Sequence, residues 1–570
     1  MIRGDRRMLV AASVLATAAL VLGISSTDLW PPDETRVAEV ARETPGADGW
    51  LVPELNGAPF LEEPPLFYWL QAGVYRLAGM PSASGARLPA AAAAICGVSV
   101  TALLARAAGA SAPLAALVLA SAPEWWWMAR SGTPDTANAA AAALALLAFF
   151  HAWRSGRGGM LAVAAAAAAF WLKSLLGVGL LLLTAGAFMA LAGRGQLAFR
   201  RIGWGLIALG ASVGVWLVAV GMARGEGAVA FFLVENHLER LLGGPAEGHV
   251  RPIWYYLVNL PLDLLPWSIV LPAAMTAAWR KRADPARLFV LVWAGVMTLA
   301  LSLAATKRAH YLLAAYPAFA VLVALWWVGP PGGRLHRATR ALLAAALLVV
   351  YPLVTLALGS ADAAALATVA SSRHRVWALA SVIRLGHGAF AWTAGLVLML
   401  GAVFVVAQRA GRPLAAAAAA GVSATVVHLL LTLTILPRLN GFVSARPVAE
   451  ALGRAADDGV ALVAFGFQNR EQLSPFLFYG RHRVVEAQTP DDLEAHLIGA
   501  RACALMPAAA YLATGDRLRA HAVTRRSVGQ RSFVLLSGSA GGCPAEERAQ
   551  RPCRKLREAD AERLASYLAL

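Results

Sequence analysis

Long apolar runs recur along most of this chain, and they constrain its fold more than any other feature. A transmembrane helix needs about 17 to 25 mostly apolar residues, and such runs follow one another from the N-terminus to residue 436. Only 15% of the residues are charged, against roughly 25% in soluble domains. The sequence therefore predicts a polytopic α-helical membrane protein. We expect about thirteen spans, near residues 8–24, 86–105, 112–128, 135–153, 160–173, 175–192, 203–223, 261–279, 288–304, 309–329, 338–358, 387–408 and 413–436.

Every second connector between these expected spans is short and basic. Because positive charge in short connectors marks the cytoplasmic side, we expect a cytoplasmic N-terminus and an extracytoplasmic C-terminal part. The net charge of +17 is then a topology signal and not a sign of nucleic-acid binding. Residues 1–24 begin like a signal peptide, but no small-x-small cleavage site follows, so we expect this run to stay as the first span.

Two segments of the expected outer side differ from the short connectors. The first outer loop, residues 25–85, is long and acidic. In it, "PPDETRVAEVARE" predicts a short helix along the membrane surface, and Pro64-Pro65 open a second one. After the last span, "GVALVAFGF", "RHRVVEA", "ARACALMP" and "SFVLLSG" read as strands, and "TPDDLEAHLIG" reads as a helix capped by Thr489. We therefore expect a membrane domain, 1–436, and a soluble α/β domain, 437–570, outside the membrane.

The four cysteines are too few for a disulfide framework. Cys543 and Cys553 are close in sequence on the expected outer side, where a disulfide survives. They are a candidate pair, although spacing alone does not demonstrate the bond.

The candidate reactive residues all lie on the expected outer side, where ATP and nucleotide sugars are not available. The sequence has neither a G-x-x-x-x-G-K-[ST] motif nor a convincing G-x-G-x-x-G motif. An enzyme there would draw its energy from an activated lipid, such as a polyprenyl phosphate carrying a sugar. Because polyprenyl phosphate leaves as a stable anion, one carboxylate to deprotonate an acceptor hydroxyl and cations to hold the phosphate suffice. Asp33 fits the base, and it equally fits a cap of the surface helix behind Pro32.

The first outer loop, "PPDETRVAEVARE…GWLVPELNGAPFLEEPPLFYWLQAGVYRLAG", resembles that of GT-C glycosyltransferases that use polyprenyl-phosphate sugars. The similarity is to the lipid A aminoarabinose transferases and the protein O-mannosyltransferase superfamily, and it covers about residues 10–330. It implies thirteen spans, an outer C-terminal domain, and Asp33 as the catalytic base with Glu34 beside it. It continues in Asn56-Gly57, Pro64-Pro65-Leu66, Arg87-Leu88-Pro89, Asp135, Lys173-Ser174, "FFLVENHLER", "PIWYYL", Pro266-Trp267 and "KRAHYLLAAYP".

One departure concerns the lipid phosphate. The aminoarabinose transferases have Glu-Lys-Pro-Pro in this loop, with a lysine thought to help hold the phosphate, whereas this chain has Glu62-Glu63-Pro64-Pro65. An anion beside a phosphate is unfavourable without a metal or a compensating base. Other cations must then hold the donor phosphate, and the candidates are Arg240, Arg251, Lys307, Arg308 and Lys173. Arg240 and Arg251 are also compatible with ion pairs on a solvated loop. Lys173 is also compatible with a side chain that extends to the membrane interface.

The remaining candidate contacts have plainer alternatives too. Asp135, Glu62 and Tyr311 are expected to bind substrate, although an acid at a helix start and a tyrosine at interface depth are common features. Glu62 and His249 together are candidate ligands of a divalent metal, but two ligands do not make a secure site. No cofactor is required by the expected chemistry.

The expected function is an inverting glycosyltransferase that moves a sugar from a polyprenyl-phosphate donor to a hydroxyl or phosphate of a lipid, glycan or protein acceptor. Within this class, a protein O-mannosyltransferase is the main alternative. A transporter or flippase of lipid-linked sugars would instead place ionisable residues at the membrane midplane, often in paired repeats. A lipid-binding scaffold would tolerate the loss of Asp33, whereas the enzyme would not.

Overall fold

A computed structural model of the chain describes residues 3–44, 50–193, 195–197, 199–243, 250–329, 333–360, 387–514, 518, 523–528 and 531–544. The chain divides into two compact units. The larger, membrane unit comprises Met1–Ser444 and the short segment Arg470–Phe478, and the C-terminal unit comprises Ala445–Asn469 and Tyr479–Leu570.

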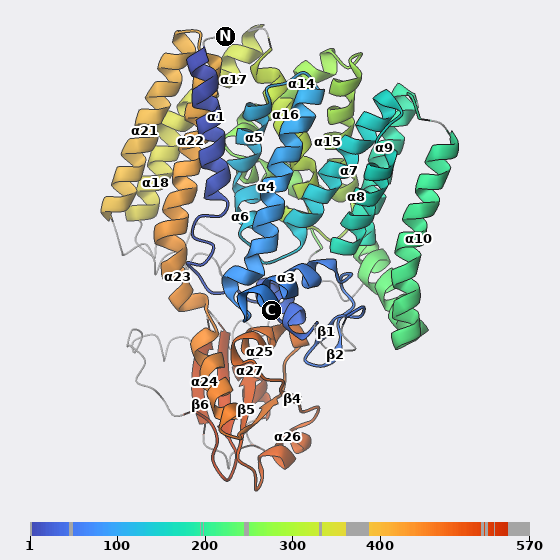
Figure 1. The fold of residues 1–570 in the computed structure, drawn as a ribbon. Coiled ribbons are helices and arrows are strands. Elements are labelled where there is room, and N and C mark those ends of the chain that lie inside the picture. The colour runs from blue at the N-terminus through green and yellow to red at the C-terminus, as the bar shows by residue number, and fades with distance from the viewer. Residues whose placement is uncertain are drawn as a thin grey trace. The chain divides into compact units, whose positions relative to one another are not determined.

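The membrane unit is a bundle of helices (Figure 1). Its first half contains α1 (Arg3–Ala19), α4 (Ala83–Ala107), α5 (Ala112–Ala120), α6 (Pro123–Ala129), α7 (Asp135–Ser155), α8 (Gly159–Leu172), α9 (Leu175–Ala192) and α10 (Phe199–Arg224). A shorter stretch follows, with α11 (Glu226–Ala230), η1 (Phe231–Glu239), α12 (Arg240–Leu242), α13 (Tyr255–Asp263) and η2 (Trp267–Ile269). The rest comprises α14 (Leu271–Arg280), α15 (Pro285–Leu303), η3 (Ala309–Ala315), α16 (Tyr316–Trp327), α17 (Gly333–Ala345), η4 (Ala346–Val350), α18 (Tyr351–Ser360), α21 (His387–Arg409), α22 (Pro413–Leu430), η5 (Leu431–Ile435) and α23 (Leu436–Val443).

The polytopic helical fold is confirmed, but the expected count of thirteen spans is not. Among the described residues, nine helices are long and apolar enough to cross a membrane. They are Ala83–Ala107, Asp135–Ser155, Leu175–Ala192, Arg201–Arg224, Pro285–Leu303, Ala309–Trp327, Gly333–Leu356, Gly388–Arg409 and Pro413–Arg438.

The other four expected spans are shorter or broken helices. The first is α1, with 17 residues, and the fifth is α8, with 14 residues. The expected span 112–128 is interrupted between α5 and α6, where Pro123 starts the second helix. The expected span 261–279 is interrupted between α13 and α14, near Pro266. Proline lacks the N–H that would continue a helix across each break.

The bundle packs around one large apolar core. Helix α1 packs against α22 and α5, and α4 packs against α7. Trp125 is fully buried in this core, and a Cβ atom at Gly97 would lie 2.6 Å from its ring. Because atoms cannot approach so closely, only glycine lets α4 contact this tryptophan.

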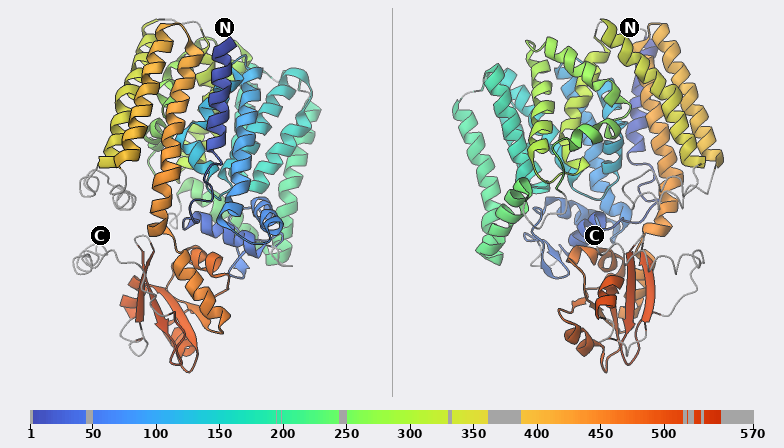
Figure 2. Two further views of the ribbon diagram at one scale, coloured as in Figure 1. Left: turned by 60° about the vertical axis from the view of Figure 1, so that its left-hand side comes forward. Right: turned by 180° about the vertical axis from the view of Figure 1, so that it is seen from behind.

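The long segment between α1 and α4 contains helices at the two expected positions, α2 (Asp33–Glu43) and α3 (Leu66–Ala78). Between them, β1 (Glu54–Leu55) and β2 (Ala58–Pro59) form a hairpin. Its turn residues Asn56 and Gly57 have φ of 54° and 75°, as an Asn-Gly turn of type I′ requires. The Glu43 carboxylate accepts both turn N–H groups at 3.0 Å, which ties the hairpin to α2. The labelled α3, β1 and β2 lie at the end of the bundle opposite the N-terminus (Figures 1 and 2).

The C-terminal unit contains one five-stranded sheet, in the order β4-β3-β5-β7-β6. Strands β3 (Ala461–Ala464), β4 (Val485–Glu486) and β5 (Ala502–Pro507) are parallel, and β7 (Arg531–Ser537) and β6 (Val523–Val528) continue it antiparallel. Helices α24 (Arg446–Asp457), α26 (Pro490–Leu497) and α27 (Ala508–Thr514) complete this unit, and α25 (Ser474–Gly480) begins in the segment Arg470–Phe478. The expected α/β character is confirmed. Strand β6 was not predicted, because its sequence "VTRRSV" is polar and it lies at the sheet edge.

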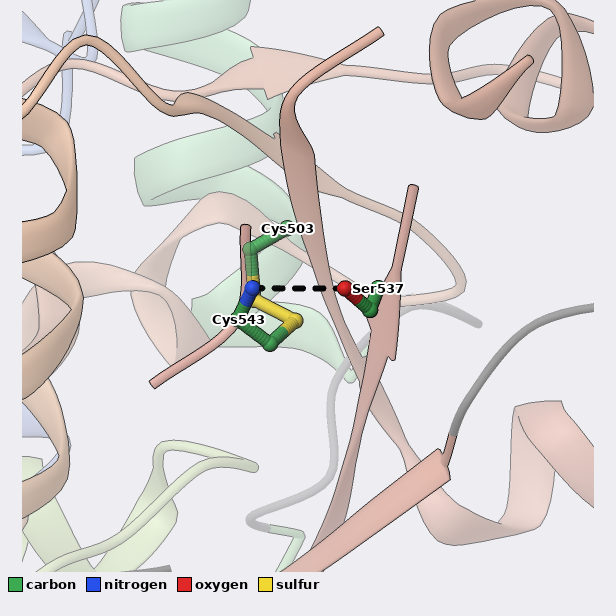
Figure 3. Close-up of a disulfide and its surroundings, with 3 residues drawn as sticks. All are labelled: Cys503, Ser537 and Cys543. Atoms are coloured by element: carbon green, nitrogen blue, oxygen red, sulfur yellow. Dashed lines mark hydrogen bonds between the residues drawn. A yellow bond between two sulfur atoms is a disulfide. The ribbon is translucent and has the colours of Figure 1, made fainter. Parts of the chain in front are cut away.

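The cysteine pairing differs from the candidate pair Cys543 and Cys553. Cys543 forms its disulfide with Cys503 of β5, with Cα atoms 4.8 Å apart (Figure 3). The turn after β7 brings Cys543 back over β5, where Ala502 N donates to Gly541 O at 3.1 Å. A Cβ atom at Gly542 would lie 2.7 Å from Ala502 O, so only glycine allows this approach. Cys553 lies outside the described residues.

Candidate functional site

Asp33 is the first residue of α2, and two guanidinium groups hold its carboxylate. Arg36 Nη2, one helical turn further on, donates to Oδ1 at 3.2 Å. Arg308 Nη1, from the segment before η3, donates to Oδ2 at 2.9 Å. The Asp33 side chain still exposes 35% of its surface, the largest fraction in this group. The carboxylate is therefore both oriented by its partners and accessible to a substrate.

The surrounding charges keep Asp33 ionised. Burial raises the pKa of Asp33, but the charges of Arg36, Arg308 and His310 outweigh it, so that the pKa lies below its ordinary value. An ionised carboxylate can accept a proton. Arg36 and Arg308 also weaken Asp33 as a base as long as both guanidinium groups remain beside its carboxylate.

Arg36 links Asp33 to two further carboxylates. Its Nη1 lies 2.6 Å from Glu471 Oε2 and 3.3 Å from Glu62 Oε2. Burial lowers the pKa of Arg36, but Glu62, Glu471 and Asp33 raise it above its ordinary value. Arg36 was not among the residues predicted from the sequence, although its i,i+3 spacing from Asp33 on one helix was a signal. No such signal exists for Glu471, which is distant in sequence.

A second cluster surrounds Lys173, in the short connection between α8 and α9. Lys173 Nζ lies 2.6 Å from Asp135 Oδ1 and 3.5 Å from Glu63 Oε1. His310 Nε2 lies 3.8 Å from the same Asp135 oxygen, and Tyr68 OH donates to Glu63 Oε2 at 3.3 Å. Three residues singled out by sequence, Asp135, Lys173 and Glu63, are thus brought together.

Burial changes the charge balance of this second cluster. It raises the pKa of Glu63 to about 7, with Lys173 opposing and Asp135 adding to the rise. The pKa of Lys173 is raised because Asp135 and Glu63 outweigh its burial. Lys173 is therefore a permanent cation, and Glu63 changes charge near neutral pH.

Glu34 is directed away from Asp33 into a buried network. Its carboxylate accepts four N–H groups, from Trp30 N at 2.9 Å and from Gly132 N, Arg87 Nε and Arg87 Nη2 at 2.8 Å each. Arg87 also donates to the carbonyls of Ile24, Thr27 and Asp28. Glu34 thus joins the start of α2 to α4, and a role for it in the reaction would be to position Asp33.

The other expected phosphate ligands lie in different environments. Lys307 is buried, and its Nζ donates to the carbonyls of Arg251, at 2.9 Å, and Ala304. The side chain of Arg251 is exposed. Arg240 begins α12, and its side chain lies outside the described part of the structure. Arg308 therefore lies nearest the candidate base among these predicted phosphate ligands.

The expected metal pair is not joined in the described structure. His249 lies outside the described residues, and Glu62 pairs with Arg36. Within the described ranges, no group of three or more His, Cys, Asp or Glu side chains is arranged to hold a metal ion. Tyr311 lies beside the second cluster, with its ring centroid 6.0 Å from Lys173 Nζ.

Solved structures share this architecture. ArnT from Cupriavidus metallidurans bound to undecaprenyl phosphate superposes with a TM-score of 0.75 at 20% identity, covering 96% of this chain and 100% of that one. Its apo state gives a TM-score of 0.76, also at 20% identity, over 94% and 99% of the two chains. The chain has the fold of these ArnT structures. The fold expected from the resemblance is thereby confirmed.

Sequence comparisons agree with this fold. Residues 62–219 match the family described as dolichyl-phosphate-mannose-protein mannosyltransferase. The undecaprenyl phosphate-alpha-4-amino-4-deoxy-L-arabinose arabinosyl transferase 2 of Proteus mirabilis is 28% identical over 319 residues, 54% of this chain and 56% of the relative. The undecaprenyl phosphate-alpha-4-amino-4-deoxy-L-arabinose arabinosyl transferase 1 of Sodalis glossinidius is 30% identical over 345 residues, which are 57% of this chain and 59% of the relative. The matched part thus spans less than two thirds of the relatives.

Proposed function

We propose that this protein transfers a sugar from a polyprenyl-phosphate donor to an acceptor, with inversion, at the outer face of a bacterial inner membrane. The observation that carries the proposal is the accessible, ionised Asp33 carboxylate held between Arg36 and Arg308 at one end of a helix bundle. The similarity to transferases named for undecaprenyl phosphate-linked aminoarabinose supports it.

The proposed reaction needs one base and no acid. Asp33 takes the proton of an acceptor hydroxyl, whose oxygen forms a bond to the anomeric carbon of the sugar. The bond from that carbon to the phosphate oxygen breaks, and polyprenyl phosphate leaves with the electron pair. A phosphate acceptor is already ionised and has no proton to lose, so sugar transfer to it would depend much less on Asp33.

Arg308 has two partners in this scheme. In the structure it holds Asp33 Oδ2, and in the donor complex the lipid phosphate competes for the same guanidinium. A phosphate that draws Arg308 away removes one of the cations that lower the pKa of Asp33. Donor binding would then strengthen the base at the moment when the acceptor needs it.

Two donor sugars are candidates. Above pH 7, where Glu63 and Glu471 are mostly charged, five carboxylates outnumber the three cations around the two clusters. The carboxylates are those of Asp33, Glu62, Glu63, Asp135 and Glu471, and the cations are Arg36, Lys173 and Arg308. This balance favours a sugar with a positively charged amino group, such as the one named in the arabinosyl transferases. Mannose transfer to protein is the second candidate, because residues 62–219 match the mannosyltransferase family.

The test is a donor and acceptor panel in liposomes. Purified protein receives undecaprenyl phosphate carrying aminoarabinose, mannose or another hexose, together with lipid, glycan or peptide acceptors. Mass spectrometry follows the loss of sugar from the donor, and nuclear magnetic resonance reports the anomeric configuration of the product. Transfer with inversion supports the proposal and identifies the donor. Movement of the intact donor across the bilayer, with no sugar lost from any donor, would indicate a flippase instead.

A further inference from the structure

One half-buried guanidinium, that of Arg36, is shared by three carboxylates. Nη2 contacts Asp33 at 3.2 Å, whereas Nη1 faces Glu471 at 2.6 Å and Glu62 at 3.3 Å. The contact to Glu471 is therefore the shortest of the three. The Arg36 side chain is also stacked near Phe60, with its Cζ 5.7 Å from the ring centroid.

Glu471 is fixed in place by the segment that carries it. Arg470–Phe478 belongs to the membrane unit although its neighbours in sequence belong to the C-terminal unit. Ser474 Oγ donates to the carbonyl of Glu471 at 2.7 Å and lies 2.9 Å from Thr35 Oγ1 of α2, where both hydroxyls are buried. At the end of the segment, Phe478 packs against Tyr75 of α3, with centroids 6.4 Å apart.

The position of Glu471 controls how Arg36 can meet Asp33. A guanidinium and a carboxylate form their strongest pair through two parallel N–H···O bonds. Arg36 makes its bond to Asp33 through Nη2, while Nη1 is directed to Glu471. The carboxylate of Glu471 thus competes for the nitrogen that an end-on pair with Asp33, through Nη1 and Nη2, would use.

We propose that Glu471 is a positioning residue for sugar transfer: it holds Nη1 of Arg36, so that the guanidinium orients Asp33 without covering its carboxylate. This inference rests on the proposed function, in which Asp33 is the base. Without Glu471, Nη1 keeps only its longer contact to Glu62, at 3.3 Å, and the guanidinium is free to turn towards Asp33. Arg308 already occupies the second oxygen, so an acceptor hydroxyl would lose its access to the base.

The first arm of the test separates catalysis from donor binding. Glu471→Gln keeps the shape of the side chain and removes its charge. Because burial raises the pKa of Glu471 to about 7, the comparison is made at pH 8, where the wild-type side chain is mostly charged. We expect it to lower kcat by about tenfold or more and to change the KM for the lipid donor by less than about twofold. Glu471→Asp, which keeps the charge, should restore most of the activity. Glu450→Gln is the matched control, because Glu450 is exposed and pairs with Arg446 in the C-terminal unit.

The second arm asks whether Glu471 acts through Arg36. If it does, Glu471→Gln causes no further loss of kcat in an Arg36→Gln background, so the two losses are not additive. Activities are referred to the amount of protein that still binds donor, so that misfolded protein does not enter the comparison. A wild-type kcat in Glu471→Gln, or additive losses in the double variant, would overturn the inference.

The failure of this inference is distinguishable from the failure of the proposed function. If Asp33→Asn transfers sugar as fast as the wild type, Asp33 is not the base. That result would contradict both the proposed mechanism and the inference about Glu471. If Asp33→Asn is inactive while Glu471→Gln has the wild-type kcat, the result supports Asp33 as the base and contradicts only the positioning role of Glu471.

Discussion

Asp33 and Glu34 are neighbours in sequence with different environments. Sequence resemblance predicted both at the catalytic centre, and the choice of Asp33 as base stays a prediction. The four N–H groups around Glu34 could not be predicted, because Trp30, Arg87 and Gly132 reach it from separate segments. Likewise, the sequence indicated an acidic loop, but it did not indicate that Arg36 would contact both Glu62 and Glu471.

Glu63 gives the site a pH dependence. Because burial raises its pKa to about 7, it is mostly neutral at pH 6 and mostly charged at pH 8. Lys173, Asp135, Arg36, Glu62 and Tyr68 surround it. The added negative charge should repel the donor phosphodiester, so we expect the donor KM to rise by about threefold or more between pH 6 and pH 8.

Glu63→Gln tests this expectation. The variant should show a donor KM that changes less between pH 6 and pH 8 than that of the wild type, because one of the two groups whose pKa is raised to about 7, Glu63 and Glu471, is gone. Steady-state kinetics at several pH values measure this dependence. The same pH dependence in wild type and Glu63→Gln would show that another group controls donor binding.

Helix α2 is anchored by side chains far apart in the sequence. Its amphipathic pattern and Pro31-Pro32 predicted a surface helix, which the structure contains at Asp33–Glu43. Its attachment to α4 through Glu34 and Arg87 has no signature in local sequence, because periodicity reports a helix but not its partners. The broken helices near Pro123 and Pro266 were also missed, since their apolar composition resembles that of continuous spans.

Breaking the Glu34–Arg87 pair should destabilise the membrane unit. Both side chains are buried, with 9% and 4% of their surface exposed. Removing one partner of a buried ion pair typically costs about 3–5 kcal/mol, because the other charge is left unpaired. We expect Arg87→Ala to lower the midpoint of thermal unfolding in detergent by several degrees, while Glu450→Gln leaves it unchanged. An unaltered midpoint in Arg87→Ala would contradict the anchoring role.

The whole chain combines a membrane unit and an α/β unit. The long apolar runs predicted the first, and the strand patterns and the capped helix after residue 436 predicted the second. The alternation of basic connectors predicts that the C-terminal unit lies outside the cytoplasm, and the disulfide Cys503–Cys543 agrees with such an oxidising environment. The pairing itself was not predictable, because the glycine turn that returns Cys543 to β5 depends on the three-dimensional path of the chain.

The disulfide should stabilise the C-terminal unit. It closes a loop between cysteines 40 residues apart in sequence, for which the chain-entropy relation gives about 4 kcal/mol. Cys503→Ser should therefore unfold at lower denaturant concentration than the wild type under oxidising conditions. Peptide mapping without reduction should recover Cys503 joined to Cys543. Recovery of a Cys543–Cys553 peptide would contradict the structure.

The predicted orientation can be tested by labelling in intact cells. Single cysteines are introduced at exposed Asp457, in the C-terminal unit, and at exposed Arg282, between α14 and α15, in a chain whose native cysteines are replaced. A membrane-impermeant thiol reagent should label position 457 in intact cells and position 282 only after the membrane is opened. The reverse pattern would invert the topology inferred from the basic connectors.

The role of Asp33 is tested most directly by comparing Asp33→Asn with the wild type in a single-turnover assay. Liposomes contain the donor identified in the panel and a hydroxyl acceptor, and donor binding is measured in parallel. We predict that the transfer rate falls by at least about 100-fold while the donor Kd does not rise, because Arg308 no longer shares its guanidinium with Asp33. Asp457→Asn, at a side chain that is 70% exposed, should transfer at the wild-type rate. A wild-type rate in Asp33→Asn would contradict its role as the base.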